Sequence, residues 1–140
     1  MKHKLLLSLL ATFLFFQCAN VEKTNNQSEE KTFESFFKDF SANQDFQLAS
    51  IDFPLEYYSV DIMDELEKGV IEKSDWNYID FTKDEDAKAA EIDAYEVVVE
   101  KTVNEVKYAR KGIDNGILIT YYFKMRDSKW YLVKIVDQSS

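Results

Sequence analysis

The residue types that most often carry catalysis and metal binding are scarce in this chain. Its 140 residues include one cysteine, Cys18, and one histidine, His3, and both lie close to the N-terminus. His3 falls in a segment that we expect to be cleaved off, so the mature domain would have no imidazole. This excludes Ser-His-Asp and Cys-His nucleophilic sites, and also zinc and most transition-metal sites, which depend on imidazole and thiolate. We therefore expect no metal and no cofactor in the domain.

Chemistry in the domain must then use carboxylates, tyrosines, lysines or serines. Two acidic clusters stand out, Asp84-Glu85-Asp86 and Asp61 with Asp64 and Glu65. Calcium needs such oxygen ligands on a suitably turned loop. The EF-hand pattern fails here because Ala89 stands where that loop needs a glycine. We favour a solvated acidic loop as the interpretation of these residues.

The end of the chain has the pattern of a β-hairpin. Alternating apolar residues in 117–126 and 129–137 flank Asp127 and Ser128, which predicts two strands joined by a two-residue turn. If Arg126 faces Lys129, the side-chain period of two sets the whole register. The more apolar face predicted in this way is Ile119, Tyr121, Phe123 and Met125 opposite Val136, Lys134, Leu132 and Trp130.

Lys134 is the one charged residue on that predicted apolar face, opposite Tyr121. It could be the polar handle of a pocket for a small acidic or carbonyl ligand, with Tyr121 and Trp130 as further lining residues. The alternative, which we favour, is a lysine near a strand end whose stem packs while its charge reaches solvent. Lys134, Tyr121 and Trp130 are thus the candidate ligand-binding residues, and no residue is assigned a catalytic role.

The N-terminus has the features of an export signal. Lys2 and Lys4 precede an apolar run over residues 5–16, which is too short to span a membrane and has the length of a signal-peptide core. Cys18 follows directly, placed like the lipidated cysteine of bacterial lipoproteins. Gln17 departs from that pattern, which prefers a small residue at this position. We predict a signal peptide over residues 1–17 and lipidation at Cys18, with simple secretion as the alternative.

The remaining chain divides into a tether and one domain. Residues 18–31 are polar and contain no aromatic residue, so we expect a flexible tether, and residues 32–140 suit a single domain. Cleavage before Cys18 leaves 15 basic against 26 acidic side chains, a net charge of −11. Nucleic acid is a poor partner for such a surface. We expect a membrane-anchored protein of the cell envelope, periplasmic or on the outer surface.

Periodicity predicts helices first and an antiparallel sheet last. A helix is expected from Ser28 to Asn43, because four phenylalanines share one face at helical spacing, and a short second helix, capped by Asp45, should follow over residues 46–49. Residues 51–60 are rich in strand formers, with Pro54 expected at a strand start or a sheet edge. A strand over 105–111 should place Val106 and Tyr108 on the apolar face of the C-terminal hairpin. Segregated helix and sheet predict an α+β domain, with the helix across a curved antiparallel sheet.

Several segments together resemble a known family. They are Phe33-Glu34-Ser35-Phe36-Phe37-Lys38-Asp39-Phe40, Asp45-Phe46-Gln47, Ile51-Asp52-Phe53-Pro54-Leu55, Lys73-Ser74-Asp75-Trp76 and Lys129-Trp130-Tyr131-Leu132-Val133-Lys134-Ile135. Over about residues 33–138 the chain is similar to Bacteroidota lipoproteins grouped as a domain of unknown function. That group is similar in fold to the cystatin-like, nuclear-transport-factor-2-like superfamily. The resemblance implies a conical α+β fold with a pocket between helix and sheet, and no particular activity.

Two functions are therefore carried forward. The first is a non-enzymatic binding or interaction domain for a protein or a small molecule. The second is a histidine-free enzyme, since some isomerases of this superfamily pair an Asp base with a Tyr donor. An enzyme should show a buried carboxylate beside a tyrosine hydroxyl in a concave site. A binding module should show an exposed apolar patch or a filled cone.

Overall fold

The computed structural model describes residues 32–60 and 65–140. The predicted signal peptide, Cys18, the tether, Ser28, Asp61 and Asp64 lie outside these residues. The helices are α1 (Phe33–Ala42), α2 (Gln44–Ala49) and three short 3₁₀ turns, η1 (Lys73–Asp75), η2 (Phe81–Glu85) and η3 (Ala87–Ala89). The strands are β1 (Ile51–Val60), β2 (Leu66–Ile71), β3 (Tyr95–Lys101), β4 (Glu105–Gly112), β5 (Leu118–Arg126) and β6 (Lys129–Asp137).

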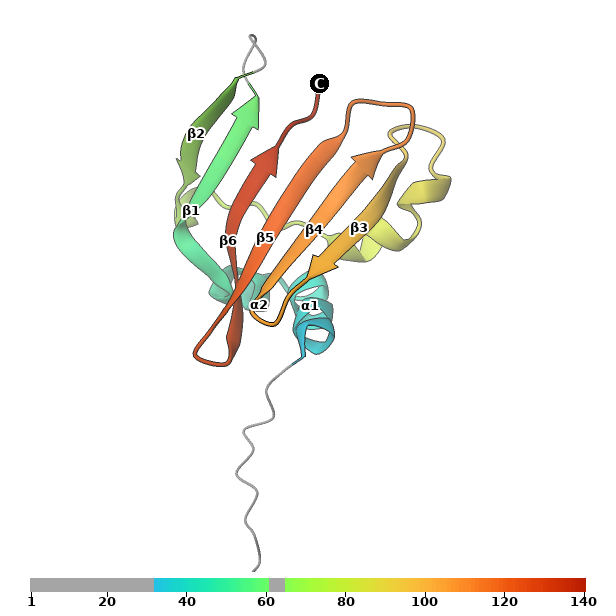
Figure 1. Ribbon diagram of the computed structural model, residues 1–140. Helices are drawn as coiled ribbons and strands as arrows, with labels where there is room; N and C mark the ends of the chain where they lie inside the picture. The colour runs from blue at the N-terminus through green and yellow to red at the C-terminus, as the bar shows by residue number, and fades with distance from the viewer. Residues whose placement is uncertain (1–31, 61–64) are drawn as a thin grey trace, which may run out of the picture.

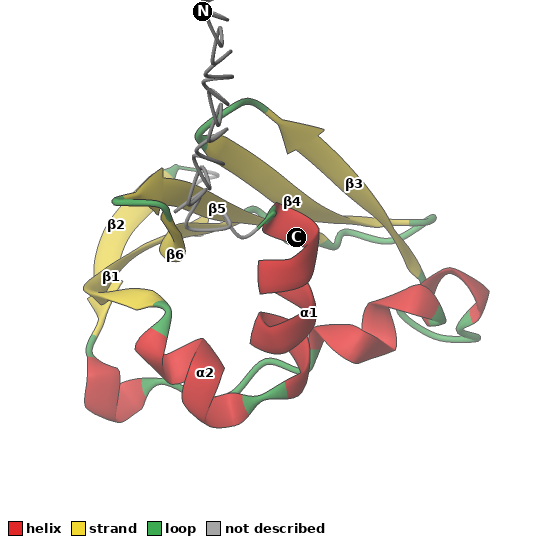
Figure 2. Ribbon diagram, turned by 90° about the horizontal axis from the view of Figure 1, so that it is seen from below, coloured by secondary structure: helices red, strands yellow, loops and turns green. Residues whose placement is uncertain are grey.

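One six-stranded sheet in the order β2-β1-β6-β5-β4-β3 makes up most of the fold (Figure 1). All neighbours are antiparallel except β1 and β6, which run parallel and join the first half of the domain to its last strand. The sheet curves around α1 and α2, which lie on its concave side (Figure 2). The predicted α+β class, with a helix packed on a curved sheet, is confirmed, but the sheet is mixed rather than purely antiparallel because β1 and β6 run parallel.

The helices begin and end where local side chains satisfy free backbone groups. The hydroxyl of Thr32 accepts from the N–H of Ser35 at 3.3 Å, so α1 begins at Phe33. The side chain of Asn43 accepts from the N–H of Phe46 at 2.9 Å, which makes Asn43 the cap of α2. The predicted cap at Asp45 is therefore wrong by two residues, although the second helix itself is confirmed.

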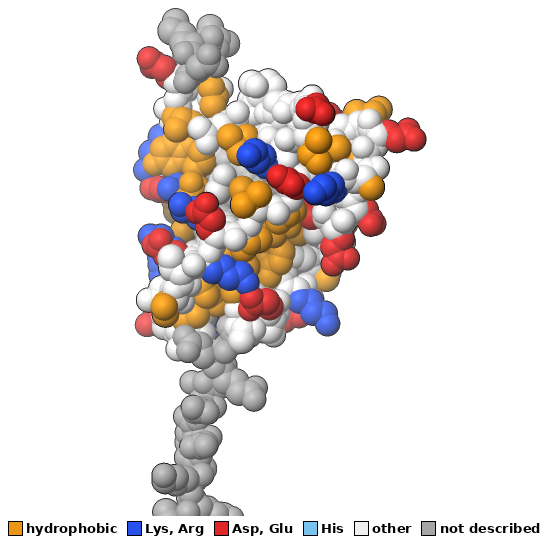
Figure 3. Space-filling view, turned by 45° about the vertical axis from the view of Figure 1, so that its right-hand side comes forward, with side chains coloured by type: hydrophobic (Ala, Val, Ile, Leu, Met, Phe, Trp, Pro, Cys, Tyr) orange, Lys and Arg blue, Asp and Glu red, His pale blue; other side chains and the backbone are white. Residues whose placement is uncertain are grey.

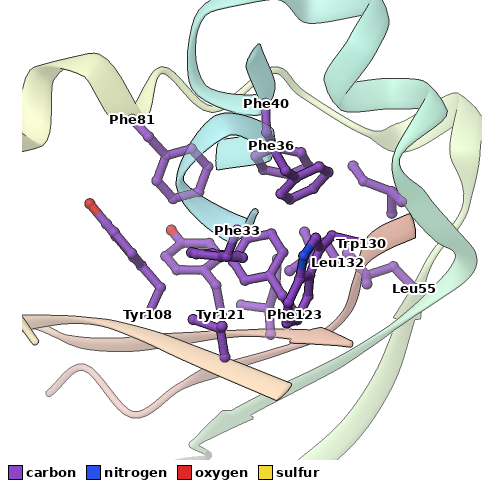
Figure 4. Close-up of a cluster of buried hydrophobic side chains, with 13 residues drawn as sticks. Phe33, Phe36, Phe40, Leu55, Phe81, Tyr108, Tyr121, Phe123, Trp130 and Leu132 are labelled. Carbon is purple, nitrogen blue, oxygen red and sulfur yellow. The ribbon is translucent and has the colours of Figure 1, made fainter. Parts of the chain in front are cut away.

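An aromatic core fills the space between α1 and the sheet (Figure 4). The rings of Phe40 and Phe123, both fully buried, meet edge to face with centroids 5.2 Å apart. The predicted stripe of four phenylalanines thus packs into the core, as do Val106 and Tyr108 of β4. Edge-to-face rings of this kind contribute stabilisation beyond the area they bury.

A buried glutamine holds α2 against the segment that follows η1. Gln47 is fully buried, and its Nε2 donates to the carbonyls of Phe40 at 2.9 Å and Ile79 at 2.8 Å. Its Oε1 accepts from the N–H of Ile79 at 2.9 Å and from the indole of Trp76 at 3.2 Å. All four hydrogen-bonding positions of the amide are occupied, so burial leaves none unpaired.

Pro54 lies inside an internal strand, whereas the sequence predicted a strand start or a sheet edge for it. β1 pairs with β2 only from Leu55 onward, and its pairing with β6 is interrupted between Ile51 and Glu56. Pro54 therefore falls in a stretch where neither neighbouring strand needs an N–H from it. Within the described part of the chain, no helix is long and apolar enough to cross a membrane.

Candidate functional site

A buried carboxylate surrounded by phenols and a guanidinium is the main polar feature of the domain. We call Asp84, Tyr95, Tyr108, Arg110 and Tyr121 the Asp84 cluster. Asp84 accepts from the hydroxyls of Tyr95 and Tyr108, both at 2.7 Å. It also accepts from Nε of Arg110 at 3.0 Å and from Nη2 at 2.8 Å. The Asp84 side chain is only 3% exposed, so these four donors replace its water.

Arg110 sits among aromatic rings as well as beside the carboxylate. Its guanidinium carbon lies 4.7 Å from the ring centroid of Phe81, and its Nη1 donates to the hydroxyl of Tyr121 at 3.1 Å. Figure 4 places Phe81 over the rings of Tyr108 and Tyr121. A guanidinium over aromatic faces gains cation–π attraction, which adds to its ion pair with Asp84.

The cluster raises the pKa of each of its three phenols. Burial, and then the hydrogen bond to Asp84, raises the pKa of Tyr95 from 10.0 to about 12. Burial also raises the pKa of Tyr121 to about 12, although the charge of Arg110 opposes it. The pKa of Tyr108 is raised further by the same burial and by its bond to Asp84. Burial is the largest single influence on Arg110 and lowers its pKa. The hydrogen bond to Asp84, together with the charge interactions with Asp84 and the neighbouring phenols, outweighs burial, so the pKa is raised.

The Asp84 cluster joins η2 to β3, β4 and β5. Both carboxylate oxygens are occupied by donors, so no lone pair faces a substrate as a general base would need. The prediction of a solvated acidic loop at Asp84 is therefore wrong, because four donors compensate the cost of burying its charge. Among residues 32–60 and 65–140, no group of three or more His, Cys, Asp or Glu could hold a metal ion.

Sequence reasoning missed this cluster, although a signal for it was present. Arg110 follows Tyr108 by two residues on β4, so the strand period puts it on the same core-facing side. A charge on a core face needs an opposite charge nearby. Asp84 supplies this opposite charge from 26 residues earlier in the chain. Only the packing of η2 brings the two residues together.

Lys134 does not lie on the apolar face of the hairpin. The pairing starts as predicted, with Arg126 opposite Lys129, but the register shifts between Tyr122 and Phe123. Val133 is the extra residue of a β-bulge, so Tyr121 faces Ile135 and Lys134 faces Tyr122 on the outer side of the sheet. Nζ of Lys134 lies 4.0 Å from the ring centroid of Tyr122. The predicted proximity of Lys134 and Tyr121 is wrong for this reason.

Tyr121 instead lines a hollow of about 250 Å³ that Ile119 and Ile135 also border. Asp137 and Tyr57 line it too, and the hydroxyl of Tyr57 donates to the Asp137 carboxylate at 3.5 Å. Burial, with Asp137 as the next cause, raises the pKa of Tyr57. This is a carboxylate beside a tyrosine in an open hollow, but Asp137 is only partly buried, whereas the enzyme hypothesis calls for a buried carboxylate.

Trp130 lines a different hollow, of about 320 Å³, between the two helices and the start of β6. Trp130 is 5% exposed, and its indole N–H has no hydrogen-bond partner among the described residues. An unpaired buried donor costs about 1–3 kcal/mol. Lys134 lines another hollow, together with Tyr122. The three candidate residues Lys134, Tyr121 and Trp130 thus line three separate hollows.

An apolar groove of about 610 Å³ runs between α1, η2 and the β3 edge of the sheet. Its walls include Phe37, Phe81, Val97 and Tyr108. Figure 3, which brings the β3 side forward, shows apolar side chains in a band bordered by acidic and basic ones. The cone itself is filled with aromatic rings, so the accessible hollows lie at its surface.

Residues 11–137 match the profile of a protein family whose description is "Domain of unknown function (DUF4348)". No curated protein matches the chain.

Two solved structures from Bacteroides share the fold. The chain is 24% identical to a nuclear-transport-factor-2-like protein of Bacteroides fragilis, with a TM-score of 0.56 over 77% of this chain. It spans only 47% of the length of that protein. It is 18% identical to a protein of Bacteroides uniformis, with a TM-score of 0.57 and 76% of both chains covered. These likenesses establish a nuclear-transport-factor-2-like fold for this chain.

Proposed function

The chain belongs to the DUF4348 family, and from that premise we propose that it is an exported, lipid-anchored envelope protein whose domain binds its partner without transforming it. The observation that carries the binding role is the Asp84 cluster. Its carboxylate is the most deeply buried one among the described residues, and four donors already occupy it. The cluster is therefore part of the scaffold, and the hollows around it are free to bind.

Export and anchoring are supported by the sequence of the N-terminus. A basic start, an apolar run over residues 5–16 and Cys18 follow one another in the order that a lipoprotein signal requires. Residues 18–31 would then separate the domain from the membrane. With a net charge of −11 after cleavage, the mature chain would be repelled by anionic lipid and held mainly by its acyl chains.

Cys18→Ser tests the anchor in a Bacteroides host that produces the full chain. We expect the wild-type protein in the membrane fraction, released by detergent but not by concentrated salt, and the Cys18→Ser variant in the soluble fraction. Ala19→Ser is the matched control and should stay in the membrane. A Cys18→Ser variant that partitions like the wild type contradicts lipid anchoring. Mass spectrometry of the mature N-terminal peptide shows whether acyl chains are attached to Cys18.

A pull-down from detergent-solubilised envelope tests the binding role. We expect the anchored wild-type protein to retain the same partner or small molecule in repeated preparations. A variant with Phe37→Asp places a charge in the apolar groove and, where circular dichroism shows that the core around Phe37 is still folded, should lose a partner that docks there. A control variant with Ile92→Asp changes a side chain that is already 79% exposed and should retain it. A partner that is held equally by all three proteins does not use the groove.

The second candidate is the histidine-free enzyme, which the hollow beside Tyr121 favours. Asp137 would act as the base, with Tyr57 or Tyr121 as the donor to a ligand oxygen. Asp137→Asn should then abolish turnover in a substrate screen while leaving the thermal unfolding midpoint within a few degrees. An equal rate in Asp137→Asn and wild type excludes this pair as the catalytic groups.

A further inference from the structure

The hollow that contains Trp130 is lined by aromatic rings and by hydrogen-bond donors. It is about 320 Å³ in volume, which suits a small ligand. Phe36, Phe46, Trp130 and Tyr131 supply its apolar surface. Four rings around so small a space favour a flat ring as the body of the ligand, because stacked and edge-on contacts both become available.

Trp130 brings a donor that the protein itself does not use. Its indole nitrogen can only donate, and no acceptor among the described residues takes its hydrogen. Figure 4 shows this nitrogen on the helix side of the ring, beside Phe33, whose ring meets that of Trp130 edge to face with centroids 5.2 Å apart. The indole nitrogen is itself buried, so a ligand oxygen reaches it only when the neighbouring rings shift, and it then completes a hydrogen bond that the fold leaves open.

The hollow also meets an open edge of β6. The N–H of Leu132 donates to the carbonyl of Ser50 at 2.9 Å, and β1 begins to pair with β6 only at that level. Because backbone groups alternate along a strand, the N–H and C=O of Trp130 point toward the same edge. No described strand covers that edge before Leu132. The ligand therefore meets backbone polar groups in addition to the indole.

Charge decides between acidic and basic ligands. Lys129 is the one charged residue that lines the hollow, and it has no ion pair among the described side chains. Ser128, which lines it as well, adds a hydroxyl. A cation with no opposing carboxylate in the lining attracts an anion and repels an amine.

The geometry points to a binding site for a small aromatic carboxylate in the hollow between α1, α2 and the start of β6. The ring lies among Phe36, Phe46 and Trp130, and the carboxylate accepts from the indole N–H with Lys129 at the rim. This inference rests on the proposed function, since it names a ligand class for a domain that binds without transforming.

Trp130 itself reports on occupancy. The chain has two tryptophans, so Trp76→Phe leaves Trp130 as the only source of indole emission. Phenylacetate titrated into this variant of the full chain should change the emission saturably. Phenylacetamide lacks the charge, phenethylamine reverses it, and acetate lacks the ring, so each should bind more weakly than phenylacetate. Equal or tighter binding of phenethylamine overturns the inference.

Two variants separate binding from folding. Lys129→Gln, at an exposed side chain, should weaken phenylacetate binding by about threefold to fivefold, whereas Lys124→Gln should not. Trp130→Phe, made in the chain that retains Trp76, keeps an aromatic ring but removes the indole N–H. Titration calorimetry should show a larger loss of phenylacetate affinity in this variant than in Lys129→Gln. Unchanged affinity in both Lys129→Gln and a folded Trp130→Phe overturns the site.

The ligand recovered after incubation distinguishes the two proposals. If phenylacetate binds and is recovered unchanged, both stand. If it binds and is converted, the site stands and the non-enzymatic role fails. If no probe binds while the Cys18-dependent anchor and the groove-dependent partner persist, the site fails and the proposed function stands.

Discussion

The carboxylate of Asp84 lies 2.8 Å from Nη2 of Arg110, and both side chains are largely withdrawn from water, with 3% and 14% of their surfaces exposed. Removing one partner of such a pair leaves the other charge buried without compensation, which is more costly than losing the attraction alone. The pair links a 3₁₀ turn to the middle of β4. The pair therefore holds η2 on the sheet together with Phe81, whose ring is buried in the core.

Asp84→Asn should destabilise the domain by about 3 kcal/mol or more, because Arg110 would keep its charge in a buried setting without a counter-ion. Urea unfolding followed by circular dichroism measures the free energy of unfolding. Asp86→Asn, at an exposed neighbouring carboxylate, is the control and should change it by less than about 0.5 kcal/mol. Similar losses in the two variants contradict the role of the pair.

Alkaline pH should weaken the fold through the buried phenols. Tyr95 loses its proton near 10.0 in the unfolded chain and at about 12 in the folded one, so the folded state binds more protons between these values. The stability contributed by Tyr95 is complete below pH 10 and is lost as the pH rises through about 12; Tyr121 acts in the same direction. Urea unfolding at a series of alkaline pH values measures this loss. Tyr95→Phe should reduce its slope, and an unchanged slope in that variant contradicts the assignment.

The β-bulge at Val133 predicts opposite outcomes at two neighbouring residues. Lys134→Met removes a cation–π contact on the outer face and should cost no more than about 1 kcal/mol. Ile135→Ala opens a cavity at a side chain that is 4% exposed and should cost about 2–4 kcal/mol. Thermal and urea unfolding of both variants measure the difference. A strongly stabilising Lys134→Met, with little effect of Ile135→Ala, would contradict the bulge. That result would indicate a regular register with Lys134 in the core.

Gln47→Leu should destabilise the domain by about 2–4 kcal/mol, although it replaces a polar side chain by an apolar one of similar size. The change leaves the backbone groups of Ile79 and the indole N–H of Trp76 without their buried partners. Differential scanning calorimetry gives the shift of the melting midpoint. Gln44→Leu, at the exposed start of α2, is the matched control. A Gln47→Leu variant as stable as wild type would show that these bonds contribute no net stability.

Patterns that depend on neighbouring residues were read correctly from the sequence. The phenylalanine stripe of α1 and the two-residue turn at Asp127 and Ser128 each depend on residues a few positions apart, so local periodicity predicts them. The same holds for the core-facing side of β4. By contrast, no local pattern shows that η1 is a single 3₁₀ turn or that the segment after it runs extended to meet Gln47.

The sequence by itself determined the α+β class, the helix-before-sheet order, and the absence of histidine and cysteine from the predicted domain, since these follow from composition and short-range spacing. The tertiary structure alone decided that Asp84 is buried against Arg110, that β1 runs parallel to β6, and that one extra residue at Val133 turns Lys134 outward. The physical reason is range. Each of these three features arises where segments far apart in the chain compete for the same space, and no local preference records which arrangement buries the most surface with every polar group paired.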